Sequence, residues 1–325
     1  MSRFVKPNIR GLERLDKVPS FSFLVEHPSG RRIMFDLGVR KDWWNLSPAL
    51  TSRFRELGWE AHVDKDVPDI LEENGFAVGS IDTVIWSHWH WDHIGDMSRF
   101  PRSTKLLVGP HLRKEILKLP LLSSDYSGRE LGEVAEFELT IGDVPAHDLF
   151  GDGSFYLLNT PGHAVGHLSA LARTTAIIHQ SPKHEGDTFI LMGGDCCHHM
   201  AQMRPSMQWP LPCDISVLSA PGQSSSLASG LSWDLEHHPQ GEDVPILQIS
   251  DHSDGKSAAT DAIEATKSLH RIRALDKANV FTIISHDKSL INVVELFPAP
   301  ANDWKLLGWS ERARWKFLNE IVHKQ

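Results

Sequence analysis

The sequence feature that most constrains this chain is a run of histidines directly after a short apolar stretch. The run is SHWHWDH, residues 87–93, and the stretch before it reads as a strand. Side chains two positions apart share a face, so His88 and His90 are expected to point the same way. Zinc favours imidazole nitrogen and carboxylate oxygen, and a catalytic zinc keeps one position for water. The run therefore predicts a metal site, in which Asp92 and His93 serve a second ion beside the first.

Three more groups of polar residues lie just past predicted strands. They are TPGH at residues 160–163, GGD at 193–195 and ISH at 284–286, after predicted strands at 154–159, 188–192 and 280–284. Loops held by a rigid sheet are where proteins tend to place their chemistry. Further chemistry is therefore expected at these strand ends.

The motif H-x-H-x-D-H at residues 88–93, followed by a later His, Asp and His in that order, resembles the signature of metallo-β-lactamase superfamily hydrolases. The resemblance covers roughly residues 20–200 and 257–290. It implies an α/β fold, the four-layer αββα sandwich, with the metals at one edge between the sheets. It also implies two zinc ions, or two other divalent transition metals. The implied ligands are His88, His90, Asp92, His93, His163, Asp195 and His286.

The same resemblance implies how the ligands are shared. His88, His90 and His163 would bind one ion, Asp92, His93 and His286 the other, with Asp195 bridging them. Two such ions, about 3.5–4 Å apart, share a hydroxide and polarise a carbonyl oxygen. Asp92 is also the predicted catalytic residue, because it is placed to manage the proton passed to the leaving group.

The stretch TPGHAVGH, residues 160–167, resembles the lactonase-like branch, which opens acyl-homoserine lactones, although TPGH also occurs in glyoxalase II-type thioesterases. Within it, His167 reads as a structural or supporting residue. The chain departs from the lactonases after Asp195, where they often carry a Tyr that holds the substrate carbonyl. Here CCHH follows at residues 196–199. His198 or His199 is a candidate replacement donor, and the two cysteines read as small buried residues.

Two tryptophan-bearing segments are candidates for substrate contact. Residues 200–254 carry Trp209 and Trp233, and they read either as a pocket wall for a hydrophobic or aromatic substrate or as packing. Trp43 and Trp44 read either as cover for the site or as a contact in a homodimer.

The predicted function is hydrolysis of a small carbonyl substrate, a lactone or a related lactam or cyclic carbamate. The alternative is thioester hydrolysis of the glyoxalase II or carrier-protein type. However, the segment after residue 296 is too short for the helical glutathione-binding domain of glyoxalase II. A remote alternative is the diiron oxidoreductase of the same fold. Those proteins carry Glu where this chain has His90, and they add a flavin-binding domain.

Composition and charge limit the domain organisation, the partners and the cellular compartment that we expect. The chain has 325 residues with 41% hydrophobic content, and we expect a single domain over 1–325 with insertions at about 120–153 and 200–256. A net charge of −9, with no basic run longer than Arg31-Arg32, disfavours nucleic acid as a partner. No apolar run approaches the roughly 20 residues of a membrane span. The three cysteines do not form a disulfide framework, which favours the reducing cytoplasm.

The remaining pattern predicts strands mixed with helices. A β-hairpin is expected at residues 21–36, a strand at 105–109 and another strand at 167–173. Residues 123–153 are polar and broken by glycines, which indicates an inserted loop or a surface hairpin. Helices are expected at residues 66–74, 111–118, 257–277 and 310–323.

Overall fold

The computed structural model describes residues 1–9, 12–116, 129–175, 186–212, 243–251 and 257–322. The chain divides into two compact units. We call Ser20–Ile141 with Pro145–Ala172 the hairpin unit, and Met1–Pro19, Gly142–Val144 and Arg173–Gln325 the terminal unit. Each unit is described by itself.

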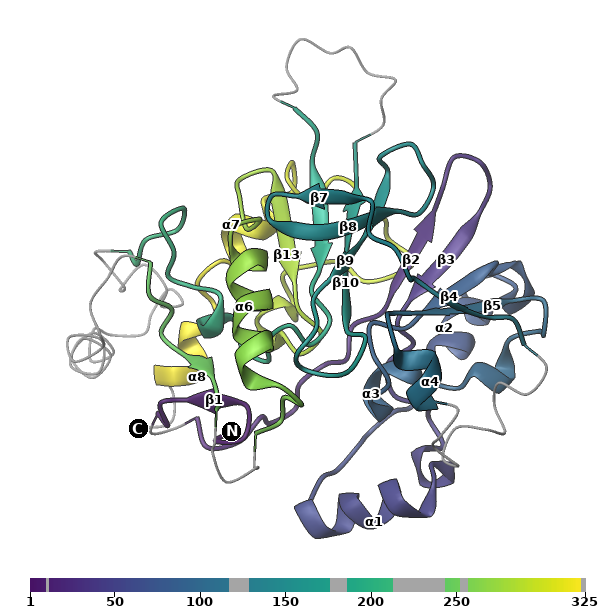
Figure 1. Cartoon of the computed structure of the whole chain (residues 1–325), viewed down its shortest axis with the longest axis horizontal. Coiled ribbons are helices and arrows are strands. Elements are labelled where there is room, and N and C mark those ends of the chain that lie inside the picture. The colour runs from purple at the N-terminus through teal and green to yellow at the C-terminus, as the bar shows by residue number, and fades with distance from the viewer. Residues whose placement is uncertain (10–11, 117–128, 176–185, 213–242, 252–256, 323–325) are drawn as a thin grey trace. The chain divides into compact units, whose positions relative to one another are not determined.

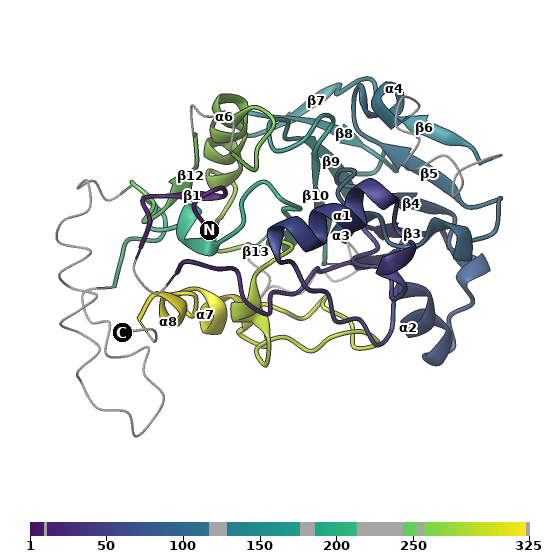
Figure 2. The ribbon, with the colours of Figure 1, turned by 90° about the horizontal axis from the view of Figure 1, so that it is seen from below.

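The hairpin unit contains a five-stranded sheet in the order β2-β3-β4-β5-β6. Its strands are β2 (Phe23–Glu26), β3 (Arg32–Phe35), β4 (Thr83–Ile85), β5 (Lys105–Val108) and β6 (Leu131–Glu133). The pair β2 and β3 is the predicted hairpin, and β3 to β6 run parallel. Figure 2 shows β3, β4, β5 and β6 following one another across this sheet. All three residues of β4 are buried, as expected of a central parallel strand.

The second set of strands in the hairpin unit follows the order β10-β9-β8-β7. These strands are β7 (Leu139–Ile141), β8 (Val144–Asp148), β9 (Phe155–Asn159) and β10 (Leu168–Arg173). The pairs β8–β9 and β9–β10 are antiparallel. A backbone hydrogen bond of 2.8 Å from Leu168 N to Ser87 O joins β10 to the loop that leaves β4. The two sets of strands are therefore tied together where the histidine run begins.

Short helices complete the hairpin unit (Figure 1). They are α1 (Pro48–Leu57), α2 (Val67–Glu73), α3 (Trp91–Ile94), α4 (Leu112–Ile116) and the 3-10 helices η1 (Trp43–Asn45), η2 (Val78–Ser80) and η3 (Met97–Arg99). Helix α2 agrees with the helix predicted at residues 66–74. The Asp66 side chain accepts from Asp69 N–H at its start, and Gly75 follows its end. Helix α4 matches the predicted helix as far as residue 116.

The terminal unit holds a parallel pair of strands and an antiparallel pair. Its elements are β1 (Val5–Lys6), β11 (Phe189–Met192), η4 (Met200–Gln202), β12 (Gln248–Ile249), α6 (Ala262–Arg273), β13 (Val280–Ile283), η6 (Lys288–Leu290), α7 (Trp309–Ala313) and α8 (Leu318–Val322). Strands β11 and β13 are parallel, and β1 pairs with β12. Among the described residues, no helix has the length and apolar character needed to cross a bilayer.

Some sequence predictions agree with the structure only in part. Of the residues expected to form a loop or a surface hairpin, β7 and β8 pair across the turn at 142–143, as in a hairpin, whereas β6 belongs to the five-stranded sheet. Helix α6 starts at Ala262 rather than residue 257, because the Asp261 side chain accepts the N–H groups of Ile263 and Glu264. Residues 120–128 and most of 200–256 lie outside the described residues, so the predicted insertions stay predictions.

The predicted terminal helix at 310–323 is two short helices, α7 and α8. At the break between them, the buried Arg204 donates from Nη1 to the carbonyl of Arg314 at 2.9 Å. Leu318 N–H instead donates to Trp315 O, three residues back, rather than to the Arg314 carbonyl. Arg204 itself is fixed by a two-point ion pair with the buried Asp276, at 2.9 Å for each contact.

A close backbone approach in the hairpin unit positions the turn that carries His163. A Cβ added to Gly109, just past β5, would lie 1.9 Å from the carbonyl oxygen of Gly166. Gly166 has φ +67°, and a Cβ there would meet Pro110 O at 2.7 Å. Neither contact ends on a flexible side chain, so any side chain at these positions forces the backbone apart.

We therefore predict that Gly109→Ala lowers the free energy of unfolding by about 2 kcal/mol or more, because overpacking against backbone is not relieved by a rotamer change. The change in the free energy of unfolding is measured by urea denaturation. The matched control is Gly79→Ala, whose nearest neighbour would be Pro101 Cγ at 3.8 Å. We expect that control to stay within about 0.5 kcal/mol of wild type. Equal effects from the two variants would contradict the close approach.

Candidate metal centre

The histidine run of the hairpin unit is held at its first residue by both sheets. Trp86 N–H donates to Leu107 O of β5 at 3.1 Å, and Ser87 O accepts from Leu168 of β10. The one-turn helix α3 then presents Asp92 and His93 one after the other. The run thus starts from a fixed backbone position, which limits where its imidazoles can point.

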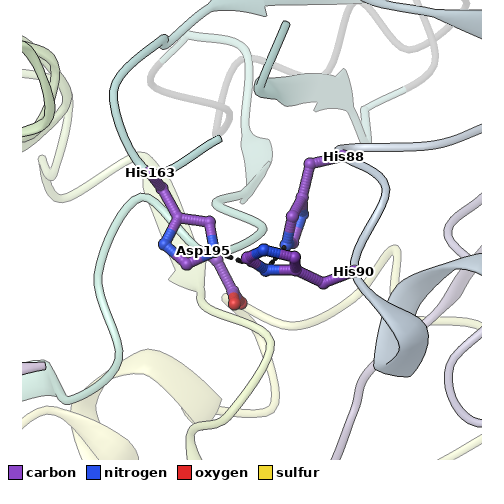
Figure 3. Close-up of side chains that lie close together, drawn as sticks. All are labelled: His88, His90, His163 and Asp195. Atoms are coloured by element: carbon purple, nitrogen blue, oxygen red, sulfur yellow. Dashed lines mark hydrogen bonds between the residues drawn. The ribbon is translucent and has the colours of Figure 1, made fainter. Parts of the chain in front are cut away.

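Three imidazoles of this unit converge (Figure 3). His88 Nε2 and His163 Nε2 each lie 2.9 Å from His90 Nδ1. His88 and His163 are buried, while His90 is half-buried. The structure therefore brings together three predicted ligands from two loops that are 73 residues apart in the chain.

Asp36, at the end of β3, organises this loop. Its carboxylate accepts from Ser87 N–H and from the Ser87 hydroxyl, both at 2.7 Å, and lies 2.9 Å from His93 Nδ1. Asp36 is 1% exposed. Asp36 is not among the predicted site residues, although its place as an acidic residue at the end of a predicted strand is a signal that could have identified it.

These hydrogen bonds decide where the imidazole protons sit. An ionised carboxylate only accepts, so His93 Nδ1 carries the hydrogen that faces Asp36. The Ser87 hydroxyl donates to Asp36, so it accepts from His88 Nδ1 at 3.0 Å. The Nε2 atoms of neutral His88 and His93 then carry lone pairs, which is the ligand form of imidazole.

The donor set fits a divalent transition metal. Two Nε2 atoms approach the same His90 Nδ1, and a single proton satisfies only one of those contacts. A cation that accepts the lone pairs of all three rings satisfies the whole group, and Zn–N distances of about 2.0–2.1 Å suit nitrogens about 3 Å apart.

Asp92 is less enclosed than these histidines. Its side chain is 17% exposed, and its Oδ1 lies 4.0 Å from His93 Nε2. Both residues offer a possible ligand atom, and these atoms lie within 4.8 Å of each other. Asp92 therefore combines a ligand position with access to solvent, which a residue that exchanges protons requires.

The terminal unit brings together the other two predicted ligands. Strands β11 and β13 are parallel with Met192 opposite Ile283, so GGD and SH leave the sheet at the same edge. Ser285 N–H donates to Gly194 O at 3.1 Å, which ties the two loops. Gly194 has φ +56°, a conformation that favours glycine.

Asp195 and His286 meet in a way that also suits a cation. His286 Nδ1 lies 2.8 Å from Pro19 O, a pure acceptor, so this nitrogen carries the hydrogen. Nε2 of a neutral His286 then turns a lone pair toward Asp195 Oδ1, 3.2 Å away. Two acceptors face each other there, which costs energy unless the imidazole is protonated or a cation accepts from both. Asp195 is 3% exposed.

The adjacent histidines His198 and His199 have different surroundings. His198 Nε2 lies 3.2 Å from Asp195 Oδ2, and its ring stacks at 5.9 Å on that of His286. His199 instead caps η4, where its Nδ1 accepts from Ala201 N–H. Burial lowers the pKa of His199 to about 3, so its ring is neutral at physiological pH. These contacts give His199 a structural role, and its predicted substrate contact stays a prediction.

Cys196 and Cys197 are both buried free thiols, as predicted. Burial raises the pKa of the Cys197 thiol well above its ordinary value, so this thiol stays protonated and is a poor nucleophile. His167 is also buried, and its Nδ1 contacts the hydroxyl and the carbonyl of Thr160 at 2.9 and 3.0 Å. It closes the turn that carries His163, in agreement with the structural reading.

The two tryptophan candidates are only partly described. Trp209 donates its indole N–H to Asp276 O at 2.8 Å, and the Arg314 guanidinium lies 3.6 Å from its ring centroid. These are packing contacts within the terminal unit, and its predicted substrate contact stays a prediction. Trp233 lies outside the described residues.

The chain resembles known proteins along most of its length. Residues 15–172 match the Metallo-beta-lactamase superfamily. Gamma-lactamase FDB1 of Fusarium pseudograminearum is 39% identical over 99% of this chain and 78% of its own length. Metallo-hydrolase mfmC of Annulohypoxylon moriforme is 40% identical over 99% of this chain and 83% of its own length.

A solved structure of a single-site mutant of AiiA from B. thuringiensis, with N-decanoyl-L-homoserine bound at the active site, is similar in fold. The TM-score is 0.52 at 15% identity, over 87% of this chain and 86% of that one. The predicted fold class, the α/β sandwich, is confirmed. With two relatives near 40% identity across almost all of the sequence, this chain belongs to the metallo-β-lactamase superfamily.

Proposed function

We propose that this chain, a hydrolase of the metallo-β-lactamase superfamily, opens a small cyclic carbonyl substrate with the help of two divalent metal ions. Zinc is the metal that we favour. The observation that carries the proposal is the convergence of the His88, His90 and His163 nitrogens, since these contacts suit a shared cation. When bound, two such ions would supply a nucleophilic water at neutral pH and polarise the substrate carbonyl.

The ligand set that we propose comes from both units. His88, His90 and His163 would hold one ion, Asp92, His93 and His286 the other, and Asp195 would contact both. The proposal rests on the order of these residues in the sequence and on their agreement with the superfamily signature. The hydrogen bonds of Asp36 and of the Pro19 carbonyl support it, because each leaves an imidazole in its ligand form.

The substrate that we propose is a cyclic amide, with the related cyclic ester and cyclic carbamate next. A relative that matches this chain almost end to end is named a gamma-lactamase, which favours the amide over the ester. Asp92 would receive the proton released by the attacking water and pass it to the departing nitrogen or oxygen. Of the two adjacent histidines, His198 is the better candidate to donate to the substrate, because it contacts Asp195.

The cysteine pattern continues to favour a cytoplasmic location. The buried state of Cys196 and Cys197 is compatible with this part of the proposal.

Metal content provides the first test. Purified wild type is expected to carry about two equivalents of divalent metal by elemental analysis. The double variant His90→Ala with His163→Ala is expected to lose at least one equivalent and all turnover. The control is His62→Ala, since that side chain is 90% exposed and lies outside both ligand groups. A wild type that holds at most one equivalent contradicts the dinuclear site.

Asp36→Asn tests the supporting carboxylate. Asp36 has φ +59°, which asparagine also tolerates, so the backbone is not strained by the change. The change removes the negative charge and replaces one of the two acceptor oxygens by an NH2 donor, so the side chain can no longer accept from Ser87 N–H at one atom and from the Ser87 hydroxyl and His93 at the other. We expect metal affinity to fall about 10–100-fold in a chelator competition. Asp82→Asn is the control, since this carboxylate accepts from Arg32 N–H in the same sheet. Unchanged affinity in Asp36→Asn would exclude this role.

A hydrolysis panel on zinc-loaded protein tests the reaction. We expect lactams, lactones and cyclic carbamates to be opened, and Asp92→Asn to lower kcat about 100-fold or more if Asp92 moves the proton. Metal content of the variant is measured in parallel, so that a lost ion is not mistaken for lost proton transfer. A preference for thioesters over every cyclic substrate would favour the thioesterase alternative instead.

A further inference from the structure

An aromatic pocket opens in the hairpin unit between η1 and the second half of α1. Its volume is about 270 Å³. It is lined by Trp43, Trp44, Thr51, Phe54, Arg55, Gly58, Trp59 and Glu60. The residues contributed by α1 and the glycine that follows it are spaced three or four apart, so they lie on one face of the helix. Four of the lining side chains are aromatic.

The rings of the pocket support one another. Trp43 stacks on Phe54 with centroids 4.8 Å apart and an interplanar angle of 9°, and Trp59 meets Phe54 edge-on at 5.8 Å. Phe54 is 2% exposed and forms the floor, whereas Trp44 is 64% exposed. A floor fixed by stacking keeps its shape, so the pocket does not have to form when a ligand arrives.

The same aromatic cluster packs against the metal-ligand loop. Trp91 lies between His90 and Asp92 in the sequence and is the first residue of α3. Its ring contacts Phe54 edge-on at 4.5 Å and lies 6.0 Å from Trp59. The walls of the pocket are thus packed on a residue whose two chain neighbours are both proposed ligands, and pocket and ligand loop share one rigid aromatic cluster.

The size and chemistry of the pocket select its occupant. An engineered apolar cavity of about 150 Å³ holds benzene, so 270 Å³ is enough for a flat bicyclic ring system. Aromatic faces favour a planar, polarisable group that stacks on them. The charged residues in the lining are Arg55 and Glu60, one of each sign, so the pocket carries no net charge to select an ion.

We propose that this pocket binds the planar aromatic part of the substrate, so that the enzyme acts on cyclic amides or esters fused to, or bearing, an aromatic ring. The substrate assignment rests on the proposed hydrolase function. Binding of an aromatic ligand in the pocket can be tested separately, without turnover. It makes Trp43, Trp44 and Trp59 specificity-determining residues, distinct from the metal ligands.

The first arm measures binding alone. Indole is the probe, because it is flat, bicyclic and neutral and has no carbonyl to hydrolyse. Calorimetric titration of the full-length, metal-loaded protein is expected to give saturable binding. Trp44→Ala and Trp43→Ala are expected to weaken it about tenfold, the effect of losing one stacking partner worth about 1.4 kcal/mol. Trp44 is largely exposed, so its variant remains informative if Trp43→Ala fails to fold.

The matched control is Leu57→Ala, which lies on the same helix, is 37% exposed and does not line the pocket. It is expected to bind indole like wild type. Absence of indole binding to wild type, or equal binding by wild type and Trp44→Ala, would overturn the pocket assignment.

The second arm compares two five-membered lactams, the aromatic oxindole and the aliphatic 2-pyrrolidinone. Trp44→Ala is expected to raise KM for oxindole about tenfold with little change in kcat, and to leave 2-pyrrolidinone unaffected. Equal losses on both lactams would overturn the specificity role. Indole binding without hydrolysis of any cyclic carbonyl would refute the proposed function while leaving the pocket in place.

The third arm tests whether a second copy of the chain fills the pocket. Light scattering after size-exclusion chromatography gives the oligomeric state of wild type and Trp44→Ala. A dimer that dissociates in the variant, together with no indole binding to the wild type, would make this surface an interface and overturn the substrate proposal. An unchanged oligomeric state with reduced indole binding supports it.

Discussion

The hydrogen bonds that Asp36 accepts are the interaction on which the histidine loop depends. One buried carboxylate holds the backbone and hydroxyl of Ser87 and the imidazole of His93, and it acts on His88 through the Ser87 hydroxyl. A buried charge is costly unless it is fully hydrogen-bonded, so these contacts stabilise Asp36 as much as Asp36 orders them. Because each contact also fixes a proton, the folding of β3 beside β4 prepares imidazoles to bind a cation.

In the terminal unit a backbone group fixes the orientation of an imidazole. The Pro19 carbonyl contacts His286 Nδ1, as the Asp36 carboxylate contacts His93 Nδ1, and His286 Nε2 then faces Asp195. In both units the candidate ligands lie in loops just past strand ends: the histidine run follows the parallel strand β4, Asp195 and His286 follow the parallel strands β11 and β13, and His163 follows the antiparallel strand β9. An enzyme that needs several fixed lone pairs is well served by this arrangement, since rigid strands carry the loops and distant hydrogen bonds set the rings.

Most of the strands were predictable, because short apolar runs bounded by turn residues are a local signal. The failures came from non-local effects. The polar, glycine-broken residues 123–153 predict a loop or a surface hairpin, yet β6 lies in the five-stranded sheet because it pairs with β5. The terminal helix is interrupted where Arg204, more than a hundred residues earlier, donates to the carbonyl of Arg314. A periodicity argument sees neither partner, since both are supplied by other parts of the chain.

The chemistry of the candidate site can be read from the amino-acid order alone: which donor types are present, their order and their positions after strands. Local rules suffice for this, because strand ends and imidazole spacing are visible in a few residues. The different roles of neighbouring residues emerge from long-range contacts. The fold sets His198 against Asp195 and His199 as a helix cap, and it places Trp91 in an aromatic cluster with Phe54. Such roles depend on partners far away in the sequence, and the direction of a side chain is fixed only when those partners meet it.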